Sequence, residues 1–279
     1  MISLTDYLIK KYSYTKSRVK KLYKYKEVYV NDKLVKMDTL IDENDKVEIK
    51  KTKEVLLDNN KKLDIIYEDK NYLVVNKPSG LLTVATDKEK ENTLYHEVRE
   101  YVKSINKNNY IYIVHRLDKD TSGIVIFAKN EKVKKELQDN WNKLVKERKY
   151  VAVVEGKLPK EKDRLENYLK ETSTNHVYVV NYKTDTLAIT NYEVISSNNK
   201  YSKLNITIET GKKNQIRSQL ANIGNPIVGD KKYSENYKGI KRLMLHASRL
   251  VFTDPISKKE MVFETSIPKE FNKLISDRK

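Results

Sequence analysis

The segment His115-Arg116-Leu117-Asp118-Lys119-Asp120-Thr121-Ser122-Gly123 separates two apolar runs, residues 110–114 and 124–128. Both runs have the composition of buried strands, so the charged segment between them is expected to be a loop on a rigid support. Buried strands do not need an arginine and two aspartates at their junction, and such loops often carry binding or catalytic groups. The alternative is a solvated turn in which Gly123 supplies a permissive backbone, because Asp, Ser and Gly are common turn residues.

Apolar patterns around this loop predict a unit that begins at residue 63 and is rich in strands. Strands are predicted over residues 63–67, 72–76, 150–155, 204–208, 243–245, 249–253 and 261–264. Helices are predicted after Thr93 and Asn130, each of which can cap the helix that follows it. The apolar sides of these helices would carry Leu94, Val98, Tyr101, Val102 and Ile105, and Val133, Leu137, Trp141 and Leu144. Helices among many strands without a regular βαβ repeat indicate an α+β domain.

The charged segment resembles the signature of the RluA family of RNA pseudouridine synthases, His-Arg-Leu-Asp-x-x-Thr-Ser-Gly, at every fixed position. Other family motifs follow in family order and extend the resemblance from about Asp64 to the C-terminus. The matching segments are Tyr72–Leu81 with its Lys-Pro-x-Gly, Lys149–Gly156, Glu209–Arg217, Pro226–Asp230 and Leu245–Ala247. Several ordered motifs are far more specific than one.

The resemblance implies a fold, an activity and a set of catalytic residues. The fold is a large mixed, mostly antiparallel sheet with flanking helices. The activity is the isomerisation of uridine to pseudouridine in RNA, with base flipping and without a metal or organic cofactor. The family assigns the nucleophile to Asp118, its ionic partner to Arg217, and contact with the target uracil to Tyr150. A carboxylate suits the role because it can attack a carbon and leave again.

The residues themselves leave alternatives open for each of these assignments. Asn214 can cap a helix that ends at Gly224, which places Arg217 in the first turn, where a cation opposes the helix dipole unless an anion is near. Taken alone, Arg217 could be an exposed surface residue and Tyr150 a core residue of a strand edge. Asp120 is two residues from Asp118 and would point elsewhere in an extended segment, so we assign it to loop structure.

Four further residues are expected to bind the substrate: His115, Arg116, Lys77 and Lys212. Arg116 would hold the flipped state or the phosphate backbone, and its alternative is a solvated side chain or an ion pair with Asp120. The family usually has Arg and His where this chain has Lys212 and Asn214. Lysine can still contact a phosphate but lacks the bidentate geometry of arginine.

Residues 1–50 form a separate expected unit with two short helices and a small β-hairpin. Ser3 and Thr15 can cap the helices, and the hairpin would turn at Asn31-Asp32-Lys33. The second helix carries the basic residues Lys16, Arg18, Lys20, Lys21 and Lys24. The unit resembles the S4 RNA-binding domain, in which these residues would contact phosphates. The alternative is a small α/β domain with a solvated lysine face. Residues 51–62 are polar and are expected to be a linker, with residues 63–279 as the catalytic domain.

Composition is consistent with an RNA partner. The chain of 279 residues has 56 basic and 39 acidic residues, a net charge of +17. Such a surplus favours a polyanion, although a general bias towards lysine would also produce it. No cysteine is present and the four histidines lack the spacing of a zinc site. With no apolar run of ~18 residues and no signal peptide, we expect no membrane association, a cytoplasmic location and a monomer on RNA.

The favoured substrate is 23S ribosomal RNA, because family members without an added N-terminal domain include tRNA enzymes. A tRNA-directed synthase is the closest alternative. A ribosome-assembly factor without activity and a metal-dependent transferase using Asp118 and Asp120 are the competing classes, and intact Asp118, Tyr150 and Arg217 oppose the first of these.

Overall fold

The computed structural model describes residues 1–12, 14–24, 27–49, 63–87, 89–237 and 239–276, without the side chains of residues 17, 18, 21 and 24. The chain divides into two compact units, Met1–Lys62 and Leu63–Lys279. This division agrees with the boundary expected at residue 63. The predicted linker, residues 51–62, lies outside the described residues.

The N-terminal unit packs two helices against short strands. The helices are α1 (Leu4–Tyr12) and α2 (Lys16–Lys24), and the strands are β1 (Ile2–Ser3), β2 (Val28–Val30), β3 (Lys33–Leu34), β4 (Leu40–Ile41) and β5 (Val47–Ile49). Leu8, Leu22 and Val28 belong to its core. Asn31 and Asp32 have φ values of 50° and 61°, so the β2–β3 hairpin turns through two left-handed residues, as asparagine and aspartate permit. The predicted helices and hairpin are therefore present.

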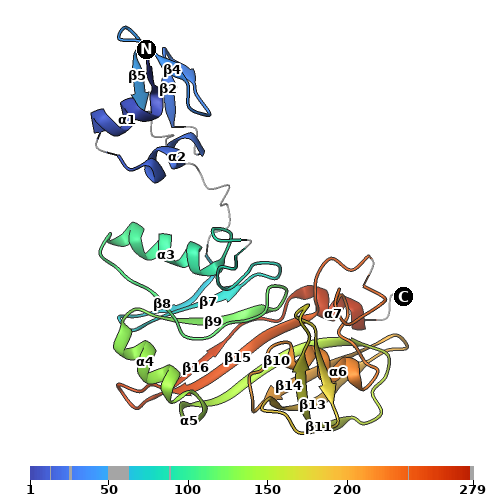
Figure 1. The fold of residues 1–279 in the computed structure, drawn as a ribbon. Helices are drawn as coiled ribbons and strands as arrows, with labels where there is room; N and C mark the ends of the chain where they lie inside the picture. Colours follow the sequence, from blue (N-terminus) through green and yellow to red (C-terminus); the bar gives the residue numbers. More distant parts are fainter. Residues whose placement is uncertain (13, 25–26, 50–62, 88, 238, 277–279) are drawn as a thin grey trace. The chain divides into compact units, whose positions relative to one another are not determined.

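Within the described residues, the second unit is built on one sheet of eleven strands (Figure 1). The strand order is β12-β11-β13-β14-β10-β15-β9-β7-β6, with β16 beside β15 and β8 beside β9. The strands are β6 (Ile65–Glu68), β7 (Tyr72–Lys77), β8 (Tyr112–Ile113), β9 (Ser122–Ala128), β10 (Val145–Glu155), β11 (Lys162–Glu171), β12 (Val177–Val180), β13 (Leu187–Ser197), β14 (Tyr201–Ile208), β15 (Leu245–Thr253) and β16 (Glu260–Glu264). The sheet is mixed and mostly antiparallel, as predicted.

The parallel pair β9–β15 lies at the centre of this sheet and joins its two halves. Ser122 pairs with His246, and Gly123 with Ala247. Gly123 has a φ of +115°, and a Cβ atom there would lie 2.2 Å from the Ala247 carbonyl oxygen. Only glycine fits both the backbone conformation and the space. The last residue of the charged segment therefore fixes the loop directly to the sheet.

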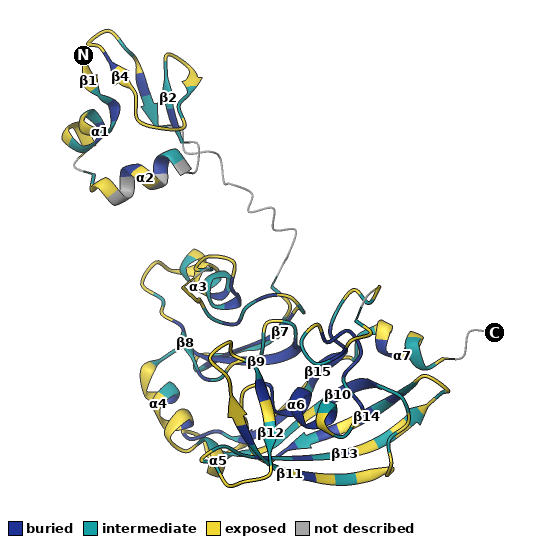
Figure 2. Ribbon diagram, turned by 45° about the vertical axis from the view of Figure 1, so that its right-hand side comes forward, coloured by how far each residue is buried: buried dark blue, intermediate teal, exposed yellow. Residues whose placement is uncertain are grey.

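Helices cover the sheet around these central strands (Figure 2). They are α3 (Leu94–Ile105), α4 (Glu131–Asp139), α5 (Trp141–Leu144), α6 (Gln215–Asn222) and α7 (Lys269–Ile275). Side chains alternate along β7, so Val75 packs with α3 while Val74 packs with α4 on the opposite face. Thr93 and Asn130 accept the expected capping hydrogen bonds.

Several expected elements differ in extent. The helix predicted through Leu144 breaks at Asn140 into α4 and α5, and Ile105 is 61% exposed instead of packing inward. The run 110–114 contributes only the two-residue strand β8, and the strands predicted over 243–245 and 249–253 form the single strand β15. Strands β11, β12 and β13 were not predicted, and in β11 and β13 polar residues alternate on a solvated face of the sheet.

Candidate active site

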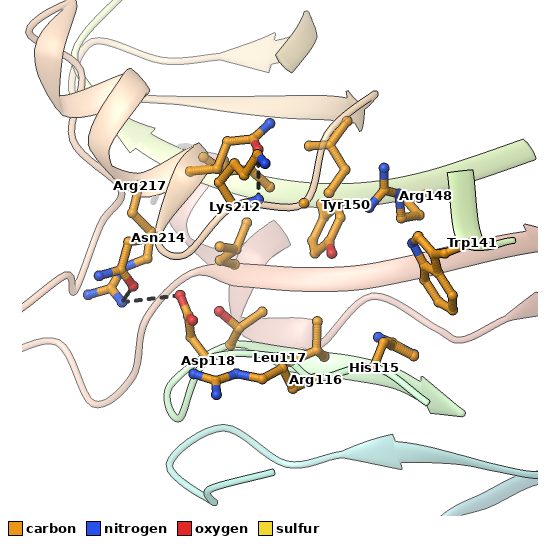
Figure 3. Close-up of a pocket in the computed structure, with 16 residues that line it drawn as sticks. His115, Arg116, Leu117, Asp118, Trp141, Arg148, Tyr150, Lys212, Asn214 and Arg217 are labelled. Atoms are coloured by element: carbon orange, nitrogen blue, oxygen red, sulfur yellow. Dashed lines mark hydrogen bonds and ion pairs between the residues drawn. The ribbon is translucent and has the colours of Figure 1, made fainter. Parts of the chain in front are cut away.

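A cavity of about 240 Å³ lies between the charged loop, β10 and the start of α6 (Figure 3). Asp118, Tyr150 and Arg217 all line it, although Arg217 is 99 residues away from Asp118 in the chain. Asp118 comes from the loop before β9, Tyr150 from the middle of β10, and Arg217 from the first turn of α6. The structure therefore brings together the three residues expected to be catalytic.

The Asp118 carboxylate faces the Arg217 guanidinium across one end of this cavity. The Asp118 Oδ2 atom lies 3.5 Å from Arg217 Nη1, and the side chains are 25% and 9% exposed. The expected ion pair is thus present, with a separation at the outer limit of a hydrogen bond. The carboxylate keeps an open side towards the cavity while the cation behind it is buried.

Asp230, which the sequence indicated only as the end of the matching segment Pro226–Asp230, is the main partner of Arg217. Its carboxylate accepts hydrogen bonds from Arg217 Nε at 2.7 Å and Nη2 at 2.8 Å, and it is fully buried. Burial alone would lower the pKa of Arg217, but the bonds and charge of Asp230, with the charge of Asp118, leave it raised. Arg217 is therefore a fixed cation.

Two more groups hold Arg217 from its other sides. Asn214 Oδ1 accepts a hydrogen bond from Arg217 Nη1 at 2.8 Å, and the guanidinium carbon lies 5.2 Å from the centre of the Tyr233 ring. This corrects the prediction that the Asn214 side chain caps α6. Asn214 has a left-handed backbone (φ 51°) and makes no capping bond, because its amide oxygen is directed at Arg217 instead.

Tyr150 lies between the two ends of the cavity (Figure 3). Its ring is partly buried and packs against two hydrophobic clusters, one that contains Val151 and Leu220 and one that contains Leu117 and Ala247. Burial raises the pKa of Tyr150 to about 12; the charge of Arg148 opposes this shift and that of Asp118 adds to it. The hydroxyl is therefore a hydrogen-bond donor at neutral pH, and the ring offers a flat apolar surface to a base.

Two of the four residues expected to bind substrate, Lys77 and His115, make structural contacts within the protein. Lys77 is fully buried and donates to the carbonyls of Pro78, Leu81 and Lys119 at 3.0, 2.7 and 2.9 Å. Burial lowers its pKa to about 7. The prediction for Lys77 is therefore wrong, because its ammonium group fastens the charged loop from behind.

His115 lines the cavity but its ring is committed to the loop. Its Nε2 atom accepts a hydrogen bond from the Ile126 amide at 3.1 Å, and the ring lies 5.2 Å from that of Trp141. Burial lowers the pKa of His115 to about 4, so the imidazole is neutral and able to accept this bond. Nε2 therefore has a structural contact, and the expected contact of His115 with the substrate stays a prediction.

Arg116 and Lys212 do line the cavity with exposed side chains. In the described part of the protein, neither side chain makes a hydrogen bond or ion pair, so both are available to a substrate. Arg148 also lines the cavity, two residues before Tyr150 on β10. Arg148 was not predicted as a site residue. Its spacing of two residues from Tyr150 could have indicated that both side chains lie on the same face of the strand.

The basic residues expected on the second helix are described only in part. Lys16 and Lys20 are exposed on α2. The side chains of Arg18, Lys21 and Lys24 lie outside the described residues.

The described residues contain no cluster of three or more His, Asp or Glu side chains that could hold a metal ion. They also contain no helix that is long and apolar enough to cross a membrane.

Comparison with known proteins identifies the family. Residues 71–222 match the family model described as RNA pseudouridylate synthase. An RNA pseudouridine synthase of Mycoplasma genitalium, itself uncharacterized, is 33% identical over 270 residues, covering 92% of this chain and 86% of the relative. The chain belongs to the RluA family of RNA pseudouridine synthases. This synthase therefore isomerises uridine in RNA, and its cavity contains the family signature.

Other relatives agree with the family and the fold. The ribosomal large subunit pseudouridine synthase D of Yersinia pestis is 28% identical to this synthase over 271 residues, covering 92% of this chain and 80% of the relative. The structure of the human RNA pseudouridylate synthase domain containing 4 superposes with a TM-score of 0.61 at 22% identity, over 75% of this chain and 90% of the human one. The latter likeness shows the shared fold.

Proposed function

We propose that this synthase converts specific uridines of large-subunit ribosomal RNA to pseudouridine, with Asp118 as the nucleophile. The observation that carries the proposal is the position of Asp118, whose carboxylate faces the cavity and lies 3.5 Å from the fixed Arg217 guanidinium. A carboxylate can form a covalent bond with the substrate and leave again without an external cofactor. The Arg217 guanidinium limits the positions that the carboxylate can take, so that its free oxygen is directed at the bound nucleotide.

The cavity supports isomerisation over hydrolysis of the glycosidic bond. A hydrolytic glycosidase normally places two carboxylates on either side of the bond that breaks. Asp118 is the one carboxylate among the described residues that line the cavity, and Asp230 behind it is buried and bonded to Arg217. In isomerisation the C1′–N1 bond breaks, a C1′–C5 bond forms, C5 loses a proton and N1 gains one. No second carboxylate is needed to activate water.

Base flipping follows from the enclosure of the site. A uridine that is stacked within an RNA helix would not reach Asp118 inside the cavity, so the nucleotide has to turn out of the stack. Turning out a paired base costs a few kcal/mol. Tyr150 offers a ring against which the uracil can stack, and exposed Arg116 at the cavity can bind the phosphate or hold the flipped state.

The proposed substrate class rests on the N-terminal unit and on the relatives. Two helices on a small set of strands, with Lys16 and Lys20 exposed, fit an S4-like unit that binds RNA phosphates. The relative from Yersinia pestis is named for the ribosomal large subunit. A substrate with extended structure can engage both the catalytic cavity and an additional basic unit.

Mapping of pseudouridine in cells tests both parts of the proposal. RNA from a strain without the gene would be compared with RNA from the same strain carrying the normal gene or Asp118→Ala. We expect a site in 23S ribosomal RNA that is lost on deletion and restored only by the normal gene. Loss of a tRNA site would assign a tRNA-directed enzyme instead. Full modification with Asp118→Ala would contradict the proposed mechanism, and restored ribosome assembly without restored modification would favour an assembly factor.

A further inference from the structure

Arg148 has no role in the function described so far, although its guanidinium reaches into the catalytic cavity. Arg148 and Tyr150 are two residues apart on β10, so their side chains project from the same face of the strand (Figure 3). We propose that the Arg148 guanidinium contacts the uracil of the flipped nucleotide and stabilises the negative charge that the base acquires during the reaction. This inference rests on the proposed function of the same cavity.

Two contacts hold the Arg148 guanidinium in place. Its Nη2 atom donates a hydrogen bond of 2.6 Å to the Glu209 carbonyl oxygen. On the neighbouring side, a Cβ atom at Gly211 would lie only 2.7 Å from Nη1. Gly211 does not have a positive φ, so its backbone would accept an alanine, but the added methyl group would displace the end of the Arg148 side chain. The loop after β14 therefore contacts the guanidinium at Glu209 and Gly211.

Arg148 forms no ion pair within the described part of the chain. Among the described residues, no carboxylate lies within 4.0 Å of its guanidinium, whereas Arg217 is paired with both Asp230 and Asp118. Arg116 and Lys212 also line the cavity, but their side chains are exposed and solvated. Burial lowers the pKa of Arg148, which shows that the site desolvates the cation without supplying an anion. A bound group that becomes negative would relieve this cost.

The reaction transfers negative charge to the base by any route that begins at Asp118. If Asp118 bonds to C1′, the C1′–N1 bond breaks and its electron pair stays on the uracil, shared by O2 and O4. If Asp118 bonds to C6, the ring electrons move towards O4. If Asp118 removes the C2′ proton, a sugar double bond forms and the uracil again leaves with the pair. A fixed donor beside the base lowers the barrier in all three cases.

Contact with the base and contact with a backbone phosphate predict different kinetics. A phosphate is charged before and during the reaction, so losing that contact would raise Kd and reduce the salt slope of RNA binding by ~1. The uracil is neutral until its bond breaks, so losing that contact would lower the rate of the chemical step and leave Kd nearly unchanged.

The test compares variants in single-turnover assays on RNA from cells that lack the gene. We expect Arg148→Met to reduce the rate of pseudouridine formation by ~100-fold with Kd within about twofold, the scale of losing one oxyanion donor. Arg148→Lys should recover part of the rate because it keeps the charge. Gly211→Ala should lower the rate by displacing the guanidinium. The matched control is Lys149→Met, which removes an exposed cation on the opposite face of β10 and should leave the rate unchanged.

Sulfur substitution in the substrate tests the contact atom by atom. RNA with 2-thiouridine or 4-thiouridine at the target would be assayed with the normal enzyme and with Arg148→Met. Each sulfur atom is expected to change the rate of pseudouridine formation relative to uridine. If Arg148 donates a hydrogen bond to O2 or O4, the rate change caused by sulfur at that position should be much smaller in Arg148→Met than in the normal enzyme, as in a double-mutant cycle. The inference would be overturned if sulfur changed the rate equally in both enzymes. It would also be overturned if Arg148→Met changed only the Kd for RNA and the salt dependence of binding. The Asp118 variants decide separately whether the proposed function fails.

Discussion

Replacement of Asp230 by asparagine should lower the free energy of unfolding of this synthase. It should also remove part of the bonding that holds the Arg217 side chain in place. The buried Asp230 carboxylate accepts two hydrogen bonds from Arg217 and a third from the Lys232 amide at 2.9 Å. Asparagine has nearly the same shape but no charge, and its amide NH₂ would face a guanidinium N–H, so one of the two bonds to Arg217 would be lost.

The expected magnitude follows from the burial of the pair. Removing one partner of a buried ion pair costs ~3–5 kcal/mol, because the other charge is left uncompensated. Arg217 would keep Asp118 at 3.5 Å and Asn214 at 2.8 Å, so we expect a loss at the lower end, ~3 kcal/mol. For a unit of about 217 residues, ~3 kcal/mol corresponds to a decrease in Tm of ~6–12 °C.

Urea and thermal unfolding of the full chain would measure this loss, with Asp163→Asn as the control. Asp163 forms an exposed ion pair with Lys160, so its variant should stay within ~0.5 kcal/mol of the normal protein. Arg217→Met combined with Asp230→Asn should cost less than the sum of the two single changes. A loss below ~1 kcal/mol for Asp230→Asn, or full additivity, would refute the view that Asp230 holds the Arg217 charge.

Three further changes test the support of the site and the role of the N-terminal unit. Because burial lowers the pKa of His115 to about 4, against ~6.5 in the unfolded chain, its contribution to the free energy of unfolding should be lost as pH falls from ~6.5 to ~4. Urea titrations should show the normal protein losing on the order of 3 kcal/mol relative to His115→Gln across that window, and parallel curves would contradict the assignment. Gly123→Ala should cost more than ~4 kcal/mol or prevent folding, as judged by circular dichroism, since its Cβ would overlap the Ala247 carbonyl; a native melting curve would exclude this reasoning. Removal of residues 1–50 should weaken RNA binding and flatten its salt dependence, whereas unchanged binding would give that unit another role.

The sequence predicted the residues that we propose to be catalytic better than the residues that hold them in place. Asp118, Tyr150 and Arg217 belong to family motifs, so their convergence could be inferred before any geometry was known. Asp230 also belongs to such a motif, but its bond to Arg217 depends on how the turn after residue 226 folds over α6. Neither spacing nor charge shows which aspartate faces a given arginine.

Contacts between distant parts of the chain, and the exposure of a face to solvent, also explain the elements that were predicted wrongly or not at all. Local rules correctly gave the caps at Thr93 and Asn130, because a cap depends on neighbouring residues only. Asn214 satisfies the same rule, yet its amide oxygen accepts a hydrogen bond from the Arg217 side chain three residues further on, and it makes no capping bond. Strands β11 and β13 escaped prediction since one of their faces is solvated and polar, which weakens the apolar pattern on which strand prediction depends.

The rate of C5–H loss with Asp118→Asn tests the central claim most directly. RNA carrying tritium at uridine C5, prepared from cells that lack the gene, would be mixed with excess enzyme, and tritium release would be followed alongside RNA binding. If Asp118 is the nucleophile, the release rate should fall by at least ~10⁴-fold while Kd stays within about threefold. A release rate within about tenfold of the normal enzyme would contradict the account, because the reaction would then proceed without the Asp118 carboxylate.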